Sequence, residues 1–148
     1  MRISAKGEYA VKAMLDLSLH WRKVLIPIQG IARRQGIPQR YLEQVLLLLK
    51  RSGFLASKRG SSGGYHLVRS PQEITVGEVI RAIEGSLESP VSGRRLGWNR
   101  PRGDSGDLQE LWRKVSDAIS DVLDGMTFAE LCERVEERNS AERPMYHI

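Results

Sequence analysis

Four side chains that lie close together in the sequence carry the hydrogen-bonding groups needed to read the edges of nucleic-acid bases. Arg40, Glu43 and Gln44 have the spacing of one helical face, and Arg59 follows in a glycine- and serine-rich segment. An arginine can donate two hydrogen bonds to guanine, a glutamine can pair with adenine, and a glutamate can accept one from the cytosine amino group. This combination indicates base recognition.

Glu43 is the most informative of these residues because its charge opposes the others. A carboxylate on a surface that meets phosphates weakens binding unless it accepts from a base donor or orients a neighbouring cation. Two interpretations are equally supported. Glu43 either reads a base directly or orients Arg40 or Arg59.

The sequence gives no comparable support for catalysis or metal binding. No histidine–carboxylate pair, cluster of metal ligands or activated nucleophile stands out, and the three histidines are scattered. An enzyme is therefore the weakest hypothesis, and we assign no catalytic residue and no metal ligand.

The base-reading side chains belong to a predicted winged helix-turn-helix. Two helical patterns, 28–35 and 38–52, flank Gly36, which can adopt the left-handed conformation that joins two helices sharply. Strands are predicted at 54–57 and 65–68, joined by a basic, glycine-rich tip. The predicted buried stripe of the second helix consists of Tyr41, Leu42, Val45, Leu46 and Leu49. Its opposite face presents Gln39, Arg40, Glu43, Gln44, Leu47 and Lys50. The predicted fold class is mainly α with a small β-hairpin wing.

Further helices are predicted on both sides of this motif. A first helix begins after Ser4 and places apolar side chains from Tyr9 to Trp21 on one face. After the hairpin, Thr75 and Glu78 form a capping box that starts a short helix, and Gly85 stops it.

The C-terminal part is predicted to contain a long loop and two helices. Residues 86–106 lack periodicity and are rich in Gly, Pro, Ser and Arg, so we expect a loop. Capping boxes at Asp107 and Thr127 start two helices that reach Asp124 and Arg138. The first helix carries an apolar stripe made of Leu108, Leu111, Trp112, Val115, Ile119, Val122 and Leu123. We interpret this stripe as a dimerisation surface, with packing onto its own chain as the alternative.

These patterns divide the chain into four parts. They are a winged helix-turn-helix domain at 1–85, a loop at 86–106, dimerisation helices at 107–138 and a frayed tail at 139–148.

The charge distribution supports a polyanionic partner. Residues 1–70 contain 13 Lys and Arg against three acids, a net charge of +10, whereas residues 71–148 contain 10 against 15, a net charge of −5. A basic half that carries a helix-turn-helix is typical of nucleic-acid binding. We find no secretory signal and no apolar run long enough to span a bilayer, so we expect a cytoplasmic protein without a membrane partner. The single cysteine agrees with a reducing compartment.

Four motifs, in order and at matching intervals, make the resemblance to a known family specific. They are Ser4-Ala5-Lys6-Gly7-Glu8-Tyr9-Ala10, Tyr41-Leu42-Glu43-Gln44-Val45-Leu46, Arg59-Gly60-Ser61-Ser62-Gly63-Gly64-Tyr65 and Thr75-Val76-Gly77-Glu78-Val79-Ile80. The chain resembles the Rrf-type winged-helix regulators of bacteria, which include the iron–sulfur cluster regulator, the nitric-oxide-sensing repressor and the cysteine-metabolism repressor. The resemblance implies a homodimer on a roughly palindromic operator in double-stranded DNA. It also implies DNA contacts by Tyr41, Glu43, Gln44 and Arg59, with Arg2 and Lys6 near phosphates.

Together, the residues and the resemblance define the candidate DNA-binding set. Its members are Arg2, Lys6, Gln39, Arg40, Tyr41, Glu43, Gln44, Lys58, Arg59, Gly60 and Ser61.

The loop at 86–106 departs from the family pattern. In cluster-binding members it supplies three cysteines for a [2Fe–2S] cluster, whereas here it contains no Cys or His and has Ser92, Trp98 and Asp104. Because clusters are held chiefly by cysteine thiolates, we expect no cluster and no other cofactor. The one cysteine, Cys132, lies on a later helix.

The leading hypothesis is a dimeric, sequence-specific DNA-binding regulator, expected to be a repressor, without an iron–sulfur cluster. One alternative is a winged-helix module for protein–protein contact, in which Arg40 and Arg59 face an acidic partner. A second is a regulator that senses a small anionic effector or a partner protein. The effector would bind four arginines and one tryptophan of the loop, Arg94, Arg95, Trp98, Arg100 and Arg102. A solvated basic loop without a ligand is favoured over such a binding site.

Overall fold

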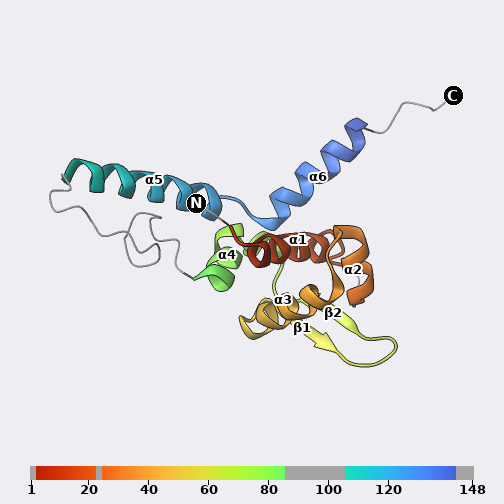
Figure 1. Cartoon of the computed structure of the whole chain (residues 1–148). Coiled ribbons are helices and arrows are strands. Elements are labelled where there is room, and N and C mark those ends of the chain that lie inside the picture. The colour runs from red at the N-terminus through yellow and green to blue at the C-terminus, as the bar shows by residue number, and fades with distance from the viewer. Residues whose placement is uncertain (1–2, 23–24, 86–105, 143–148) are drawn as a thin grey trace.

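The computed structural model describes residues 3–22, 25–85 and 106–142 of the chain. In these ranges the chain forms six α-helices, one short 3₁₀ helix and one two-stranded antiparallel hairpin. The elements are α1 (Ala5–Leu19), α2 (Ile28–Gln35), α3 (Gln39–Arg51), β1 (Leu55–Lys58), β2 (Gly64–Leu67), η1 (Pro71–Glu73), α4 (Val76–Glu84), α5 (Gly106–Asp124) and α6 (Phe128–Glu142). In Figure 1, α1 to α4 and the hairpin form one group, from which α5 and α6 extend in different directions. This arrangement confirms the predicted fold class.

The core is built around α1. Its residues Ala10, Ala13 and Met14 are inaccessible to solvent, and α2, α3, α4 and the start of α6 pack against the helix. Helix α1 begins as its sequence indicates, because the Ser4 hydroxyl accepts a hydrogen bond from the Gly7 N–H at 3.1 Å.

The helix-turn-helix forms where it was predicted. Gly36 has a φ of 64°, in the left-handed region, and the Ile37 N–H closes the turn by donating to the Ala32 carbonyl at 3.0 Å. Helix α3 then starts directly after Pro38 and buries one stripe of aliphatic side chains, made of Leu42, Val45, Leu46 and Leu49.

The helical periodicity predicted burial wrongly for two aromatic residues. Tyr41 was expected in the buried stripe but is 60% exposed, because it lies about 90° around the helix from the stripe's centre at 100° per residue. Its ring instead packs against Tyr9 of α1, with centroids 6.3 Å apart. Trp21 is exposed as well, since α1 ends at Leu19 and the helical spacing no longer applies beyond it.

The two strands of the hairpin are each shifted by one residue from their predicted ranges, β1 toward the C-terminus and β2 toward the N-terminus. They pair with Leu55 opposite Leu67 and Lys58 opposite Gly64. An additional segment, absent from the sequence interpretation, pairs with it. Ile26 and Tyr65 exchange two backbone hydrogen bonds of 2.9 Å. A Cβ atom at Gly64 would lie only 2.6 Å from the Ile26 carbonyl oxygen, so this position requires glycine.

The C-terminal helices are anchored to this core at the junction between them. The Val76 N–H donates to the Met126 carbonyl at 2.9 Å, the Phe128 N–H donates to the Ile74 carbonyl at 3.0 Å, and the Phe128 side chain is fully buried. Arg81 of α4 makes a bidentate contact with Asp124 at the end of α5, and this hydrogen bonding lowers the pKa of Asp124.

Two details of the C-terminal prediction are corrected and one is confirmed. Asp107 lies inside α5 and does not cap it. Thr127 does cap α6, with its hydroxyl accepting from the Glu130 N–H at 3.2 Å. The helix continues to Glu142, so the first residues of the predicted frayed tail are helical. Residues 86–105, most of the predicted loop, lie outside the described residues.

A buried carboxylate joins α1 to α2. Asp16 is 1% exposed, and both of its oxygens accept hydrogen bonds of 2.9 Å from Arg34, while Gln35 donates to Oδ2 at 3.1 Å. These bonds compensate the cost of burying the charge, and hydrogen bonding to Asp16 raises the pKa of Arg34. Because Arg34 and Gln35 end α2, Asp16 holds the point at which the chain turns into α3.

We expect Asp16→Ala to lower the free energy of unfolding by about 2 kcal/mol, the scale of hydrogen bonds to a charged group, since Arg34 can regain water when its partner is removed. Urea unfolding followed by circular dichroism measures the change. The matched control is Glu8→Ala, which removes an exposed ion pair with Lys12 on the same helix and should cost under about 0.5 kcal/mol. Equal losses in the two variants would contradict a structural role for Asp16.

Candidate nucleic-acid interface

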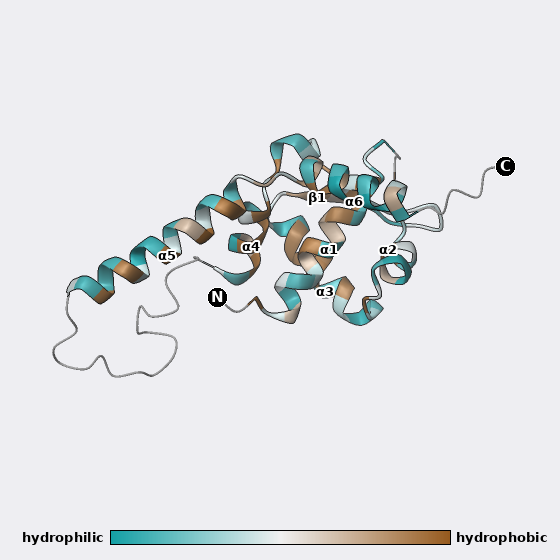
Figure 2. Cartoon of the chain, turned by 90° about the horizontal axis from the view of Figure 1, so that it is seen from above, coloured by the Kyte–Doolittle hydropathy of each residue, from teal (hydrophilic) through white to brown (hydrophobic). Residues whose placement is uncertain are grey.

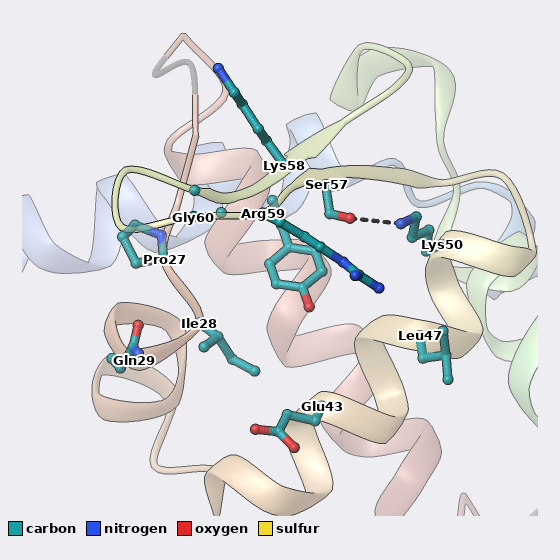
Figure 3. A pocket seen from close by; sticks show the side chains of 13 residues that line it. Pro27, Ile28, Gln29, Glu43, Leu47, Lys50, Ser57, Lys58, Arg59 and Gly60 are labelled. Atoms are coloured by element: carbon teal, nitrogen blue, oxygen red, sulfur yellow. Dashed lines mark hydrogen bonds between the residues drawn. The ribbon is translucent and has the colours of Figure 1, made fainter.

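Helix α3 and the hairpin form the two walls of an open groove of about 480 Å³. Glu43, Leu47 and Lys50 line it from α3, and the hairpin contributes a longer segment that includes Arg59. Figure 3 shows the Arg59 side chain reaching from the hairpin toward α3. Pro27, Ile28 and Gln29, which enter α2, complete the lining.

The groove and the surface beside it bring together two parts of the candidate set that are separate in the sequence, and Glu43, Lys58, Arg59 and Gly60 line the groove itself. From α3 come Gln39, Arg40, Glu43 and Gln44, all exposed and all in its first two turns. From the hairpin tip come Lys58, Arg59, Gly60 and Ser61, also exposed. The Gly63 N–H donates to the Gly60 carbonyl at 3.0 Å and closes the turn at this tip.

A direct hydrogen bond holds the hairpin against the end of α3. The Lys50 ammonium group donates to the Ser57 hydroxyl at 2.7 Å, as the dashed line in Figure 3 marks. Both residues are on the groove, so this bond positions one wall relative to the other.

Glu43 lies on a surface that is otherwise basic. Lys50, Lys58 and Arg59 line the same groove. Within the described parts of the chain, no basic group lies within 4.0 Å of the Glu43 carboxylate. The free protein therefore leaves this carboxylate available to a ligand, and an orienting contact with Arg40 or Arg59 is not preformed.

Two of the three remaining candidate residues are exposed on the first turns of α1 and α3, and the third is not among the residues that the structure describes. Tyr41 is exposed, with its ring tilted against that of Tyr9, and Lys6 is exposed in the first turn of α1. Arg2 lies outside the described residues.

Nine of the thirteen groove residues were not in the candidate set, Leu47, Ile28 and Gln29 among them. Leu47 was placed on the outward face but not included among the candidate contacts, although its position there followed from helical periodicity. Ile28 and Gln29 reach the groove because Ile26 pairs with Tyr65, and this long-range pairing leaves no local signal in the sequence.

The apolar stripe of α5 lies apart from this groove and is largely uncovered. Leu108, Leu111, Val115 and Val122 are exposed, and Trp112, Ile119 and Leu123 are partly covered. Leu123 packs against the core, near the Arg81–Asp124 contact. Figure 2 shows hydrophobic and hydrophilic residues alternating along the helix.

Comparison with known proteins identifies the class of regulator. Residues 3–134 match the Rrf2 family, described as iron-dependent transcriptional regulators. The chain belongs to the Rrf2 family. Its relatives include the HTH-type transcriptional regulator IscR of Pectobacterium carotovorum, which is 42% identical over 143 residues, covering 97% of this chain and 86% of that protein. IscR of Serratia proteamaculans is 42% identical over 131 residues, covering 88% and 79%.

Solved structures of two Rrf2-type regulators agree with the observed fold. IscR of T. potens has a TM-score of 0.78 at 35% identity, covering 99% of this chain and 97% of that one. CymR, the global cysteine regulator of B. subtilis, has a TM-score of 0.79 at 30% identity, covering 90% and 98%. The chain is therefore a DNA-binding transcriptional regulator with a winged helix, and its family is not one of enzymes. The resemblance drawn from the sequence is confirmed.

The iron dependence of the family can be tested against the residues of this chain. The sequence contains a single cysteine, Cys132, which is half-buried on α6. Burial, together with the negative charges of Glu136 and Glu133, raises the pKa of this thiol to about 11. Since cluster ligation needs several thiolates, one protonated thiol does not fit a [2Fe–2S] cluster.

The described residues offer no replacement for those ligands. They contain no group of three His, Cys, Asp or Glu side chains that could hold a metal ion. The loop positions Ser92, Trp98 and Asp104, and the loop cations Arg94, Arg95, Arg100 and Arg102, lie outside the described residues. No helix in the described ranges is long and apolar enough to cross a membrane.

Proposed function

We propose that this Rrf2 regulator is a homodimer that binds a roughly palindromic operator in promoter DNA as a cytoplasmic repressor, without an iron–sulfur cluster. The observation that carries the proposal is the groove between α3 and the hairpin. Glu43 and a basic, glycine-containing tip line this groove, and three further exposed polar side chains lie beside Glu43 at the start of the helix.

In the proposed complex, α3 enters the major groove with its N-terminal turns toward the bases. Recognition helices read base edges with side chains in these turns, so Arg40, Glu43 and Gln44 would specify sequence. Lys58 and Arg59 on the hairpin would contact phosphates or an adjacent narrow minor groove, and Gly60 lets the backbone approach closely. Lys6, which is exposed in the first turn of α1, would add a phosphate contact.

The proposal of a homodimer rests on α5. Its stripe exposes four large aliphatic side chains, and burying them against the same helix of a second copy would remove this apolar surface from water. A two-fold axis there would present two recognition helices to half-sites about 34 Å apart. The division into a winged domain at 1–85, a loop and C-terminal dimerisation helices fits this assembly, although the buried start of α6 belongs to the core of the winged domain.

Two alternatives have less support. Protein–protein contact through the same face would use Arg40 and Arg59, but it gives the base-reading pattern of α3 no role. Control by an anionic effector or a partner protein remains compatible with DNA binding and concerns how the regulator is switched.

We expect Glu43→Ala to reduce the preference for a cognate duplex, selected from a random library by the wild-type protein, over its scrambled sequence by about tenfold. The reason is that one base contact is lost. Fluorescence anisotropy at several salt concentrations measures both affinities. The control is Lys58→Ala, which should weaken binding to both duplexes equally and reduce the salt dependence. Unchanged discrimination in Glu43→Ala would rule out base reading, and failure to select any sequence would rule out the proposed function.

We expect Leu111→Glu to convert the protein to a monomer, because the substitution places a charge within the proposed apolar interface. Size-exclusion chromatography with light scattering should give about 33 kDa for the wild type, twice the 16.7 kDa of one chain, and the monomer mass for the variant. The control is Arg113→Glu on the opposite face of α5, which should remain dimeric. A dimeric Leu111→Glu would show that this stripe is not the interface.

We expect Cys132 to remain a protonated, unligated thiol. With a pKa of about 11, only roughly 0.1% is thiolate at pH 8, compared with about a quarter for an ordinary cysteine. Alkylation by iodoacetamide should therefore be slow at pH 8 and accelerate toward pH 11, and the unfolded protein should react at the ordinary rate. Rapid alkylation of the folded protein would contradict this, as would an iron–sulfur absorption band after anaerobic purification that Cys132→Ala abolishes.

A further inference from the structure

We infer that Leu47 is a specificity-determining residue that contacts the C5-methyl group of a thymine in the operator; this inference rests on the proposed DNA-binding function. Leu47 is 47% exposed on α3 and lines the groove between the recognition helix and the hairpin. A single exposed leucine needs no explanation by itself. Its position on the reading face is what makes this one informative.

Helical geometry places Leu47 near the centre of that face. With 100° per residue, it lies about 40° from Glu43 and about 20° from Arg40, one and two turns further along the helix. The residues around it on the same face are exposed and polar, namely Gln39, Arg40, Glu43, Gln44, Lys50 and Arg51. In Figure 3, Glu43 and Leu47 project from successive turns of α3.

Leu47 faces the groove, whereas its neighbours Leu46 and Leu49 are fully buried on the other side of α3. Tyr41, the other large exposed side chain of this helix, packs in a tilted arrangement against Tyr9. Leu47 shares its wall with Lys50, which binds Ser57 of the hairpin, and Lys58 and Arg59 line the opposite wall. The apolar residues of the lining, Pro27, Ile28 and Tyr65, come from the entry to α2 and from the hairpin, and they leave Leu47 47% exposed.

The chemistry of the major groove determines which chemical group of the DNA can pack favourably against this apolar side chain. Each base pair presents hydrogen-bond donors and acceptors, and the one apolar group among them is the thymine methyl. Phosphates and polar base edges gain nothing from a leucine. A thymine opposite Leu47 would allow both apolar groups to leave water together, which discriminates against cytosine at that position.

Replacement of thymidine by deoxyuridine tests this directly, because it removes the methyl group and leaves every hydrogen-bonding group in place. The probe is the duplex selected by the wild-type protein, with each thymidine replaced in turn. Losing one buried methyl should weaken wild-type binding about fourfold at one position per half-site, and roughly fifteenfold when both half-sites are changed. In Leu47→Ala the same replacements should have no effect.

Three further variants separate methyl contact from other causes. Leu47→Met retains an apolar side chain and should keep the sensitivity to deoxyuridine. Arg40→Ala and Gln44→Ala should bind more weakly overall but respond to deoxyuridine at the Leu47 position as the wild type does. Thermal unfolding should show that Leu47→Ala is folded, since a half-exposed side chain contributes little to the core.

The outcomes distinguish this inference from the proposed function. Sequence-selective binding with equal responses of wild type and Leu47→Ala to deoxyuridine at every position would overturn the role of Leu47 and leave the proposed function standing. A selected operator with no thymine in either half-site would likewise overturn the role of Leu47 and leave the proposed function standing. If the wild-type protein selects no sequence, the proposed function fails and the inference fails with it.

Discussion

The buried carboxylate of Asp16 is the interaction on which the geometry of the proposed DNA-binding surface depends. It lies inside the core on α1, yet its three hydrogen bonds go to Arg34 and Gln35, the last two residues of α2. The chain turns at Gly36 immediately afterwards and enters α3. An error in the direction of α2 would therefore be passed on to the recognition helix. An aliphatic residue in place of Asp16 could bury the same area, but it could not fix the orientation of two polar side chains in this way.

The second wall of the groove depends on backbone contacts more than on side chains. Strand pairing between Ile26 and Tyr65 attaches the hairpin to the segment that precedes α2, and the absence of a side chain at Gly64 permits this close approach. At the other end, the bond from Lys50 to Ser57 attaches the hairpin to α3. The hairpin is thus held by both helices of the helix-turn-helix. A two-stranded ribbon alone is at best marginally stable in water, so these attachments explain how a four-residue strand pair can present Arg59 at a defined place.

Local chemistry predicted most of the elements, and long-range packing explains the errors. Caps at Thr75 and Thr127 and the left-handed Gly36 are properties of a few neighbouring residues, and all three are observed. Periodicity also located the exposed polar face of α3. It could not place Tyr41, whose environment is set by Tyr9 on another helix, and it could not bring Ile28 and Gln29 to the groove. The backbone pairing of Phe128 with Ile74, which lies more than fifty residues earlier in the chain, is a further long-range contact without a local signal.

The residues proposed to read DNA and the loop to which the resemblance assigns the cluster lie in different parts of the chain, and this separation allows one to change without the other. The groove residues come from α3, the hairpin and the start of α2, whereas the resemblance assigns cluster ligands to the 86–106 loop. At the junction, Glu84 in the last turn of α4 accepts a hydrogen bond from the Ser4 N–H at 3.0 Å, and Arg81 binds Asp124. These contacts connect the end of α4, which precedes the loop, to the start of α1 and to the end of α5. Neither contact involves a cysteine that could bind a cluster. A chain whose loop contains no cysteine can therefore keep its reading surface intact, and a different signal could act on the same DNA-binding fold.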